Sequence, residues 1–328
     1  MRRYYIEQKL KSAAAFLIIL ILLPYIVSVF VRGTGVRADR KEEETYVQVK
    51  TEDARGEIQT EELGWTEYLV GILAEDLPRD TEHEAVKAQA VLVRTSLYQT
   101  LSKEDKTLES DYLTRGEMQE KWGLSDYQEI YDSYVQAVEE TDNLVLWYGD
   151  GYPWVPFHQS SNGMTRSAEE VTGSKDYPYI AAKECPLDKE AEDEIQVFSF
   201  GYSEIQEKCR DFLVAAEGED EARQGYSFED FEIQSRDSSG YVQKLRIGKT
   251  VCTGDQFRDA LSLPSSDFSF SEDGNKMKIT TSGKGHGLGM SLWTANEMAK
   301  EGKTCEEILN FFFEGTSLKN DVQESDLI

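Results

Sequence analysis

Two acidic residues at the end of a short apolar segment are the first candidates for chemistry. The segment GILAEDLP carries Glu75 and Asp76 just before a proline. A carboxyl group that is partly removed from water can stay protonated near neutral pH and donate its proton to a leaving oxygen. Glu75 is therefore a candidate general acid. The competing interpretation is a solvated acid near a helix end, because the chain holds 62 acidic residues.

The segment FHQSSNGMT contains His158, Ser160, Ser161 and Gly163. A serine beside a histidine can form the nucleophile and base of a hydrolase. These serines have no G-x-S-x-G elbow around them, which argues against that chemistry. Two interpretations remain, a loop that positions a sugar or another substrate, and a structural turn.

A third segment, SGKGHGLGMS, is rich in glycine and runs from Ser282 to Ser291. It has neither the G-x-G-x-x-G order nor the G-K-[ST] ending of nucleotide-binding loops. A tight loop of this kind can present His286 and backbone N–H groups to a ligand. The alternative is close packing of the backbone against a neighbouring segment.

The three histidines and four cysteines show no metal-binding pattern. No histidine lies in an H-E-x-x-H motif, and the cysteines lack C-x-x-C spacing. We therefore predict no metal site and no cofactor. Disulfides and buried free thiols are both open for Cys185, Cys209, Cys252 and Cys305.

Composition excludes some classes of protein. The 62 acidic and 35 basic residues give a formal charge of −27, which argues against nucleic-acid binding because phosphates repel an acidic surface. Hydrophobic residues make up 39% of the 328 residues, enough for a packed core.

The N-terminus has the pattern of a membrane anchor. Basic residues precede an uncharged apolar run over residues 13–31. A helix of that length spans about 28 Å, close to the hydrocarbon thickness of a bilayer. We expect residues 1–32 to form a cytoplasmic basic stub and a single transmembrane helix, with the rest of the chain extracytoplasmic. A cleaved signal peptide is the alternative, but no A-x-A cleavage site follows the run.

Helices are predicted at both ends of the folded body. Apolar spacing predicts a helix over residues 65–77, ended by Pro78. Thr81 and Glu84 have the spacing of a capping box for a second helix, which extends to Leu101. Further helices are expected over residues 290–300 and 305–313, and Thr304 and Glu307 have the spacing of a capping box for the second of them. Three polar residues of the second helix lie off the centre of its apolar stripe: Gln89, Arg94 and Thr95.

The middle of the chain favours strands. Residues 144–148, 152–161 and 241–251 have β-type composition, and residues 268–280 form a hairpin pattern with a turn at Asp273-Gly274. We expect an α+β fold with a single domain. An acidic polar linker is predicted over residues 33–60, the folded body over 61–318 and a polar tail over 319–328.

Four ordered motifs together resemble those of the SpoIID/LytB family. They are YLVGILAEDLP followed by EAVKAQAVLVRT, then HQSSNGMT, then Ser239-Gly240 followed by TGDQFRDALSLPSSDF, and finally GHGLGMSLWTANEMA. They cover nearly all of the predicted body. The single N-terminal anchor also fits this resemblance.

The resemblance implies a lytic transglycosylase with a SpoIID-type catalytic domain. Such enzymes cleave the bond between N-acetylmuramic acid and N-acetylglucosamine in peptidoglycan and leave 1,6-anhydromuramic acid ends. The acid of the family's first motif corresponds to Glu75 here. Asp76 replaces a methionine of the motif, and its like charge is expected to raise the pKa of Glu75.

The resemblance also implies a substrate and partners. It implies denuded glycan strands as substrate, degradation of septal peptidoglycan during engulfment, an amidase partner like SpoIIP and a membrane partner like SpoIIM. The alternative is a non-catalytic module that binds peptidoglycan and recruits or stimulates an amidase. The implied substrate-binding residues are Gln89, Arg94, His158, Ser160, Ser161, Gly163, His286, Gly287, Gly289 and Ser291.

Overall fold

The structure is a computed structural model that describes residues 45–52, 57–102, 107–109, 111–217 and 225–320. These residues belong to one compact unit that begins at Thr45. The expected anchor over residues 13–31 lies outside the described residues. Within the described part, no helix has the length and apolar character needed to cross a membrane.

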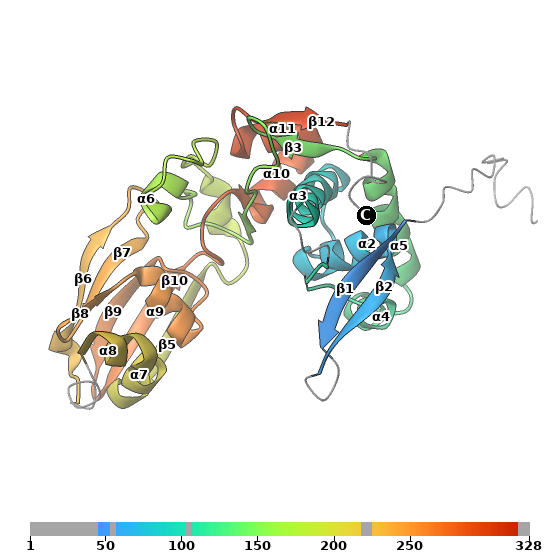
Figure 1. Ribbon diagram of the computed structural model, residues 1–328. Coiled ribbons are helices and arrows are strands. Elements are labelled where there is room, and N and C mark those ends of the chain that lie inside the picture. The colour runs from blue at the N-terminus through green and yellow to red at the C-terminus, as the bar shows by residue number, and fades with distance from the viewer. Residues whose placement is uncertain (1–44, 53–56, 103–106, 110, 218–224, 321–328) are drawn as a thin grey trace, which may run out of the picture. The chain divides into compact units, whose positions relative to one another are not determined.

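A long helix lies at the centre of the first hydrophobic core. This helix, α3 (His83–Leu101), packs against α2 (Trp65–Asp76), α5 (Tyr127–Glu140), α10 (Leu292–Lys300) and α11 (Cys305–Phe312) (Figure 1). The short helix α4 (Arg115–Trp122) covers α2 and α5.

Because α3 is surrounded by other elements, three of its polar residues are fully buried, contrary to the expectation of a free polar side. They are Gln89, Arg94 and Thr95.

The folded body begins earlier than predicted. β1 (Tyr46–Glu52) lies inside the predicted linker of residues 33–60, and it forms an antiparallel hairpin with β2 (Ile58–Gly64), which begins in that linker. Val47 and Val49 alternate in β1 with polar residues and are buried in the first core. The many acidic residues of this stretch hide the alternation, which is why the linker boundary is wrong.

Short strands tie distant parts of the first core together. β3 (Val145–Trp147) pairs antiparallel with β12 (Ser317–Lys319), so the body extends to the start of the predicted tail. β4 (Phe157–His158) pairs parallel with β11 (Met290–Ser291). The strand predicted over residues 152–161 is therefore only two residues long.

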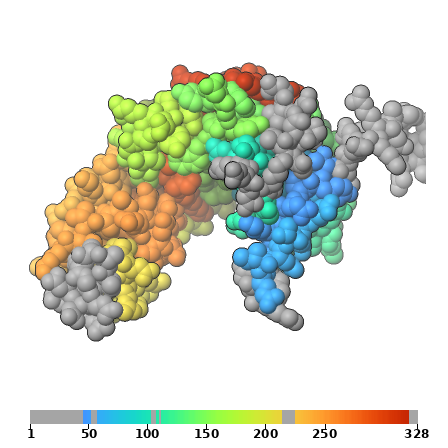
Figure 2. Space-filling model, viewed as in Figure 1, coloured from blue at the N-terminus to red at the C-terminus, as the bar shows by residue number. Residues whose placement is uncertain are grey.

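The second core lies between two three-stranded sheets and their helices (Figure 1). In the space-filling view, side chains close the gaps between these ribbons (Figure 2). The first sheet has the order β5-β10-β9 and the second β6-β7-β8. The elements are β5 (Ile195–Gly201), β6 (Phe231–Arg236), β7 (Val242–Ile247), β8 (Thr250–Cys252), β9 (Phe268–Asp273), β10 (Lys276–Ser282), α7 (Tyr202–Lys208), α8 (Arg210–Glu217) and α9 (Gly254–Leu261).

The strand predictions hold in part. The hairpin over residues 268–280 is confirmed, with Gly274 at a φ of 61° in its turn. Residues 241–251 were expected as one strand but form two, because Gly248, at a φ of 57°, turns the chain between β7 and β8. The mixture of helices and antiparallel sheets confirms the α+β class.

The two predicted capping boxes have different outcomes. Thr304 and Glu307 form a complete box at the start of α11. The box of Thr81 and Glu84 is wrong, because α3 begins at His83. Glu84 accepts a hydrogen bond from the backbone N–H of Cys305 at 2.6 Å instead. The Glu84 carboxylate therefore binds the distant Cys305 and the nearby Lys87 but not the backbone of Thr81.

An ion-pair cluster joins the segments around the two cores. Arg166, which is 2% exposed, donates from Nε to Asp237 at 2.7 Å and from Nη1 to Asp255 at 3.0 Å. Its guanidinium lies 4.9 Å from the centre of the Tyr241 ring. The short helix α6 (Ala168–Thr172) follows directly. All four cysteines lie in the described residues as buried free thiols.

Candidate active site

The last turn of α2 carries both candidate acids. Glu75 is exposed and Asp76 is partly buried. The final carbonyl groups of a helix have no partner within it. Here Lys121 of α4 donates from Nζ to the carbonyl oxygens of Ala74 at 2.6 Å and Glu75 at 3.2 Å. Gln159 donates from Nε2 to the Asp76 carbonyl at 2.9 Å. Two remote side chains therefore fix the backbone that bears Glu75.

Asp76 lies in a less polar setting than its neighbour. Burial raises the pKa of the Asp76 carboxyl to about 6, and the charge of Glu75 adds to the rise. Gln89 donates to Asp76 Oδ2 at 2.9 Å, which opposes part of this effect. The raised pKa of Asp76 therefore comes mainly from burial, and the adjacent Glu75 makes a smaller contribution.

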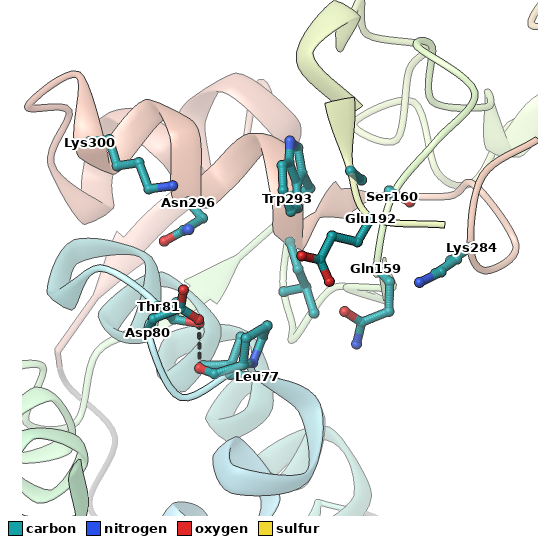
Figure 3. A pocket seen from close by; sticks show the side chains of 13 residues that line it. Leu77, Asp80, Thr81, Gln159, Ser160, Glu192, Lys284, Trp293, Asn296 and Lys300 are labelled. Atoms are coloured by element: carbon teal, nitrogen blue, oxygen red, sulfur yellow. Dashed lines mark hydrogen bonds between the residues drawn. The ribbon is translucent and has the colours of Figure 1, made fainter. Parts of the chain in front are cut away.

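A cavity of about 320 Å³ opens directly after this turn (Figure 3). Its lining includes Leu77 but not Glu75, which lies two residues before it. The walls come from the end of α2, the loop after β4, residues 191–192, the glycine loop and α10. The lining residues are Leu77, Pro78, Asp80, Thr81, Gln159, Ser160, Ala191, Glu192, Lys284, Leu292, Trp293, Asn296 and Lys300.

The two loops singled out in the sequence lie side by side next to the cavity. Ser160 and Lys284 exchange backbone hydrogen bonds at 3.1 and 2.8 Å. The backbone N–H of Trp293 donates to the Gln159 carbonyl at 3.0 Å. Segments more than 100 residues apart in the sequence are thereby combined into one wall.

Close packing explains the glycines of the loop. A Cβ at Gly289, whose φ is 71°, lies 1.9 Å from the carbonyl oxygen of Pro156. A Cβ at Gly287 lies 2.9 Å from the Arg166 side chain. Side chains at these positions collide with neighbouring segments, so the glycines permit the loops to approach.

The two predicted histidines contact the backbone of the same residue, Leu288. His158 Nδ1 lies 3.0 Å from the Leu288 carbonyl oxygen, and the Leu288 N–H donates to His286 Nδ1 at 3.0 Å. Burial lowers the pKa of His158 and of His286 to about 4, so both rings are neutral near pH 7. Neither ring lines the cavity.

A buried carboxylate that sequence reasoning missed organises the same wall. Asp188 accepts from Ser161 N and Oγ at 2.6 Å each, from Ser291 Oγ at 2.8 Å and from Thr294 Oγ1 at 2.6 Å. These donors lie between 27 and 106 residues away in sequence. No local spacing could have indicated the arrangement. Ser161 and Ser291 therefore hold Asp188 and do not line the cavity.

The remaining predicted residues have mixed positions. Ser160 lines the cavity. Arg94 is buried and donates to the carbonyl oxygens of Leu144 at 3.0 Å and Val138 at 3.3 Å, contacts that account for it without a ligand. The Gly163 carbonyl accepts from Cys185 N at 2.9 Å. Their roles in substrate binding stay predictions.

Comparison with known proteins places the chain in context. Residues 53–148 match the family model SpoIID, described as Stage II sporulation protein. This segment contains Glu75, α2 and α3. The resemblance to this family that the four motifs indicated is therefore confirmed.

Similar proteins extend the match beyond that segment. Stage II sporulation protein D of Bacillus subtilis (strain 168) is 28% identical over 270 residues, covering 79% of this chain and 75% of that protein. The protein of the same name from Bacillus amyloliquefaciens is 29% identical over 278 residues, covering 81% and 76%. An uncharacterized protein of Brachyspira hyodysenteriae is 28% identical over 262 residues, covering 78% and 67%.

Proposed function

We propose that the chain is a membrane-anchored lytic transglycosylase that cleaves the MurNAc–GlcNAc bond of denuded peptidoglycan strands. One observation carries the proposal: Glu75 is exposed on a helix turn that Lys121 and Gln159 hold rigidly beside a polar cavity. Catalytic groups act best when their supporting backbone is fixed before the substrate binds.

One carboxyl group is enough for the reaction. The protonated Glu75 donates its proton to the glycosidic oxygen as the bond from that oxygen to C1 of the muramic acid breaks. The resulting carboxylate then accepts the proton of the C6 hydroxyl, whose oxygen bonds to C1. The products are a free N-acetylglucosamine hydroxyl and a 1,6-anhydro ring, with no water consumed and Glu75 again protonated.

The setting follows from the sequence and the relatives. Residues 13–31 anchor the chain with its N-terminus in the cytoplasm, and the described unit acts outside the membrane. The Bacillus relatives are named as stage II sporulation proteins, which supports a role in septal peptidoglycan degradation during engulfment. A SpoIIP-like amidase that removes the peptides and a SpoIIM-like membrane protein are the proposed partners.

A second candidate function is a peptidoglycan-binding module that recruits or stimulates an amidase. The observation that favours it is the lining of the cavity, which has several polar side chains but excludes Glu75. In this alternative, the cavity binds a sugar and Glu75 has no role in bond cleavage.

The two candidates differ in their products. The full chain is incubated with amidase-treated peptidoglycan, and soluble products are analysed by mass spectrometry for 1,6-anhydro ends. The enzyme predicts anhydro products from the wild type and from Asp76→Asn, and none from Glu75→Gln. Binding of glycan by the wild type without any anhydro product supports the module and rejects the transglycosylase.

A further inference from the structure

We infer that Glu192 is a sugar-binding carboxylate, presented to the cavity by residues 188–194, which we call the arm. The inference deepens the proposed function and rests on it for the identity of the glycan. It assigns the cavity to one neutral N-acetylglucosamine unit of the glycan strand, whose C3 hydroxyl and C2 amide N–H are neighbouring donors.

The arm is anchored at its first residue by Asp188. That carboxylate is fully buried and accepts four hydrogen bonds from three residues of two other segments. Its donors belong to the loop after β4 and to the start of α10. Both of these segments also line the cavity. The start of the arm is therefore fixed relative to two cavity walls.

Glu194 anchors the other end. Its carboxylate accepts from Ser282 Oγ at 2.7 Å and from Ser160 Oγ at 3.4 Å. Its carbonyl oxygen accepts from the backbone N–H of Gly283 at 3.0 Å. Burial raises the pKa of Glu194, and its hydroxyl donors oppose that rise.

Between the two anchors the chain makes an unusual turn. Asp193 has a φ of 54°, a left-handed conformation that residues other than glycine adopt uncommonly. Such conformations persist where the surroundings determine them and are frequent at binding sites. The turn leaves Glu192 and Asp193 exposed between two buried carboxylates.

The Glu192 side chain points into the cavity. Figure 3 shows its carboxylate between Trp293 and Gln159, in the open space of the site. Within the described residues it has no hydrogen-bond or ion-pair partner. A carboxylate has two oxygens that can each accept a hydrogen bond, which suits two adjacent donors such as the C3 hydroxyl and the C2 amide N–H of N-acetylglucosamine.

The other walls favour a neutral sugar over an anion. The lining has two lysines, but Lys300 pairs with Glu297 at 2.7 Å and Lys284 lies 3.8 Å from Asp193. Two acids, Asp80 and Glu192, balance their charge. The half-buried indole of Trp293 adds an apolar surface, and pockets that combine an aromatic ring with a few polar groups are typical of small-ligand sites.

The sugar in this cavity lies next to the proposed catalytic turn. Gln159 lines the cavity and donates to the Asp76 carbonyl, one residue after Glu75. When one sugar unit is bound at Glu192, the next unit of the glycan strand therefore lies beside α2. Glu192 acts in binding, so its loss should raise KM more than it lowers kcat.

The test compares Glu192→Gln with Glu190→Gln in the full chain. Glu190 is also exposed and lies two residues away, but does not line the cavity. Binding of peptide-free glycan strands is measured by calorimetry in a Glu75→Gln background, where no turnover occurs. We expect Glu192→Gln to weaken binding roughly ten- to hundredfold, as for loss of charged hydrogen bonds, and Glu190→Gln to leave it unchanged.

A second variant and a second measurement distinguish a loss of binding from a folding defect. Trp293→Ala removes the aromatic wall and should also weaken glycan binding. Equal melting temperatures of Glu192→Gln and the wild type check that Glu192→Gln folds normally. Steady-state kinetics with Glu75 intact should show the higher KM. If Glu192→Gln binds and cleaves like the wild type, the inference is overturned, whatever Trp293→Ala does, while the proposed function stands.

The reverse outcome is also distinguishable. If the wild type binds glycan through Glu192 but forms no anhydro product, the transglycosylase proposal fails and the sugar site remains. If the wild type neither binds nor cleaves glycan, both are rejected.

Discussion

Two carboxylate-bearing regions border the cavity, and they are built in opposite ways. At the end of α2, remote side chains bind backbone carbonyls and leave the exposed Glu75 side chain without a structural task. In the arm, the buried carboxylates of Asp188 and Glu194 themselves hold the structure, and the exposed Glu192 lies between them. Each region thus presents an exposed acid, Glu75 or Glu192, on a fixed backbone.

The comparison separates structural acids from acids available to a ligand. A buried carboxylate needs several donors to offset the loss of water, and Asp188 has four. Asp76 has one side-chain donor, Gln89, and burial raises the pKa of Asp76 to about 6. The number of donors around an acid is thus a better guide to its role than its place in a motif.

The largest expected effect comes from Glu75→Gln. Loss of a general acid should reduce the rate of anhydro-product formation by roughly 10²- to 10⁴-fold. Because Glu75 is exposed, the melting temperature should not change. Turnover is measured by mass spectrometry and stability by thermal melting. A variant that melts like the wild type and is equally active would exclude Glu75 as the acid.

Asp188→Ala should show the opposite behaviour, a loss of stability. Its removal leaves buried donors of Ser161, Ser291 and Thr294 without their acceptor, at a cost of at least about 3 kcal/mol. Urea unfolding measures the difference. Glu190→Ala, in the same short helical turn but exposed, is the control and should change stability by less than about 0.5 kcal/mol. Similar values for both variants contradict the structural role of Asp188.

Asp76→Asn should change how stability depends on pH. The pKa of Asp76 is about 6 in the folded chain against 3.8 ordinarily, so the folded state binds this proton more tightly. Its stabilising contribution is therefore present below about pH 4 and lost as the pH rises through 6. Over this range the free energy of unfolding of the asparagine variant should rise relative to that of the wild type, by up to about 3 kcal/mol at pH 7.

Urea unfolding of both proteins between pH 4 and 7 measures this gain. The contributions of His158 and His286, whose pKa values are lowered by burial, are common to both proteins and cancel in the difference. A difference that does not vary with pH means that Asp76 ionises normally.

The smallest expected effect is the difference in stability cost between mutations in the two predicted capping boxes. Thr304→Ala removes a side chain that caps α11 and should cost about 1 kcal/mol. Thr81→Ala should cost less than half as much, because the Thr81 hydroxyl donates only to the Pro78 carbonyl and caps no helix. Equal costs in chemical unfolding would mean that Thr81 caps α3 after all.

Elements with strong local patterns could be predicted. Residues 65–77 have helical apolar spacing and a following proline, and α2 ends as expected. The hairpin of β9 and β10 follows from alternation around a glycine turn. Glu75 stood out because its motif resembles that of a family. The resemblance also identified the loops that hold Ser160 and Lys284, although it did not single out Lys284 itself.

Elements that depend on distant partners could not be predicted. β1 carries its apolar residues in a highly charged stretch, and its burial depends on the helices it covers. Glu84 has a local partner in sequence, but binds Cys305, 221 residues away. Glu192 lies in an acidic run where nothing marks it out, and only the cavity distinguishes it from Glu190.

The sequence alone determined the α+β class, the four helices predicted near the two ends of the body, the candidate segments for chemistry and the first candidate acid. These depend on periodicity, turn residues and motifs within about 20 residues. The tertiary structure alone decided which acids are buried among donors and which face the cavity. That distinction depends on hydrogen bonds between residues up to 106 positions apart around Asp188, and such contacts leave no spacing signal in the chain.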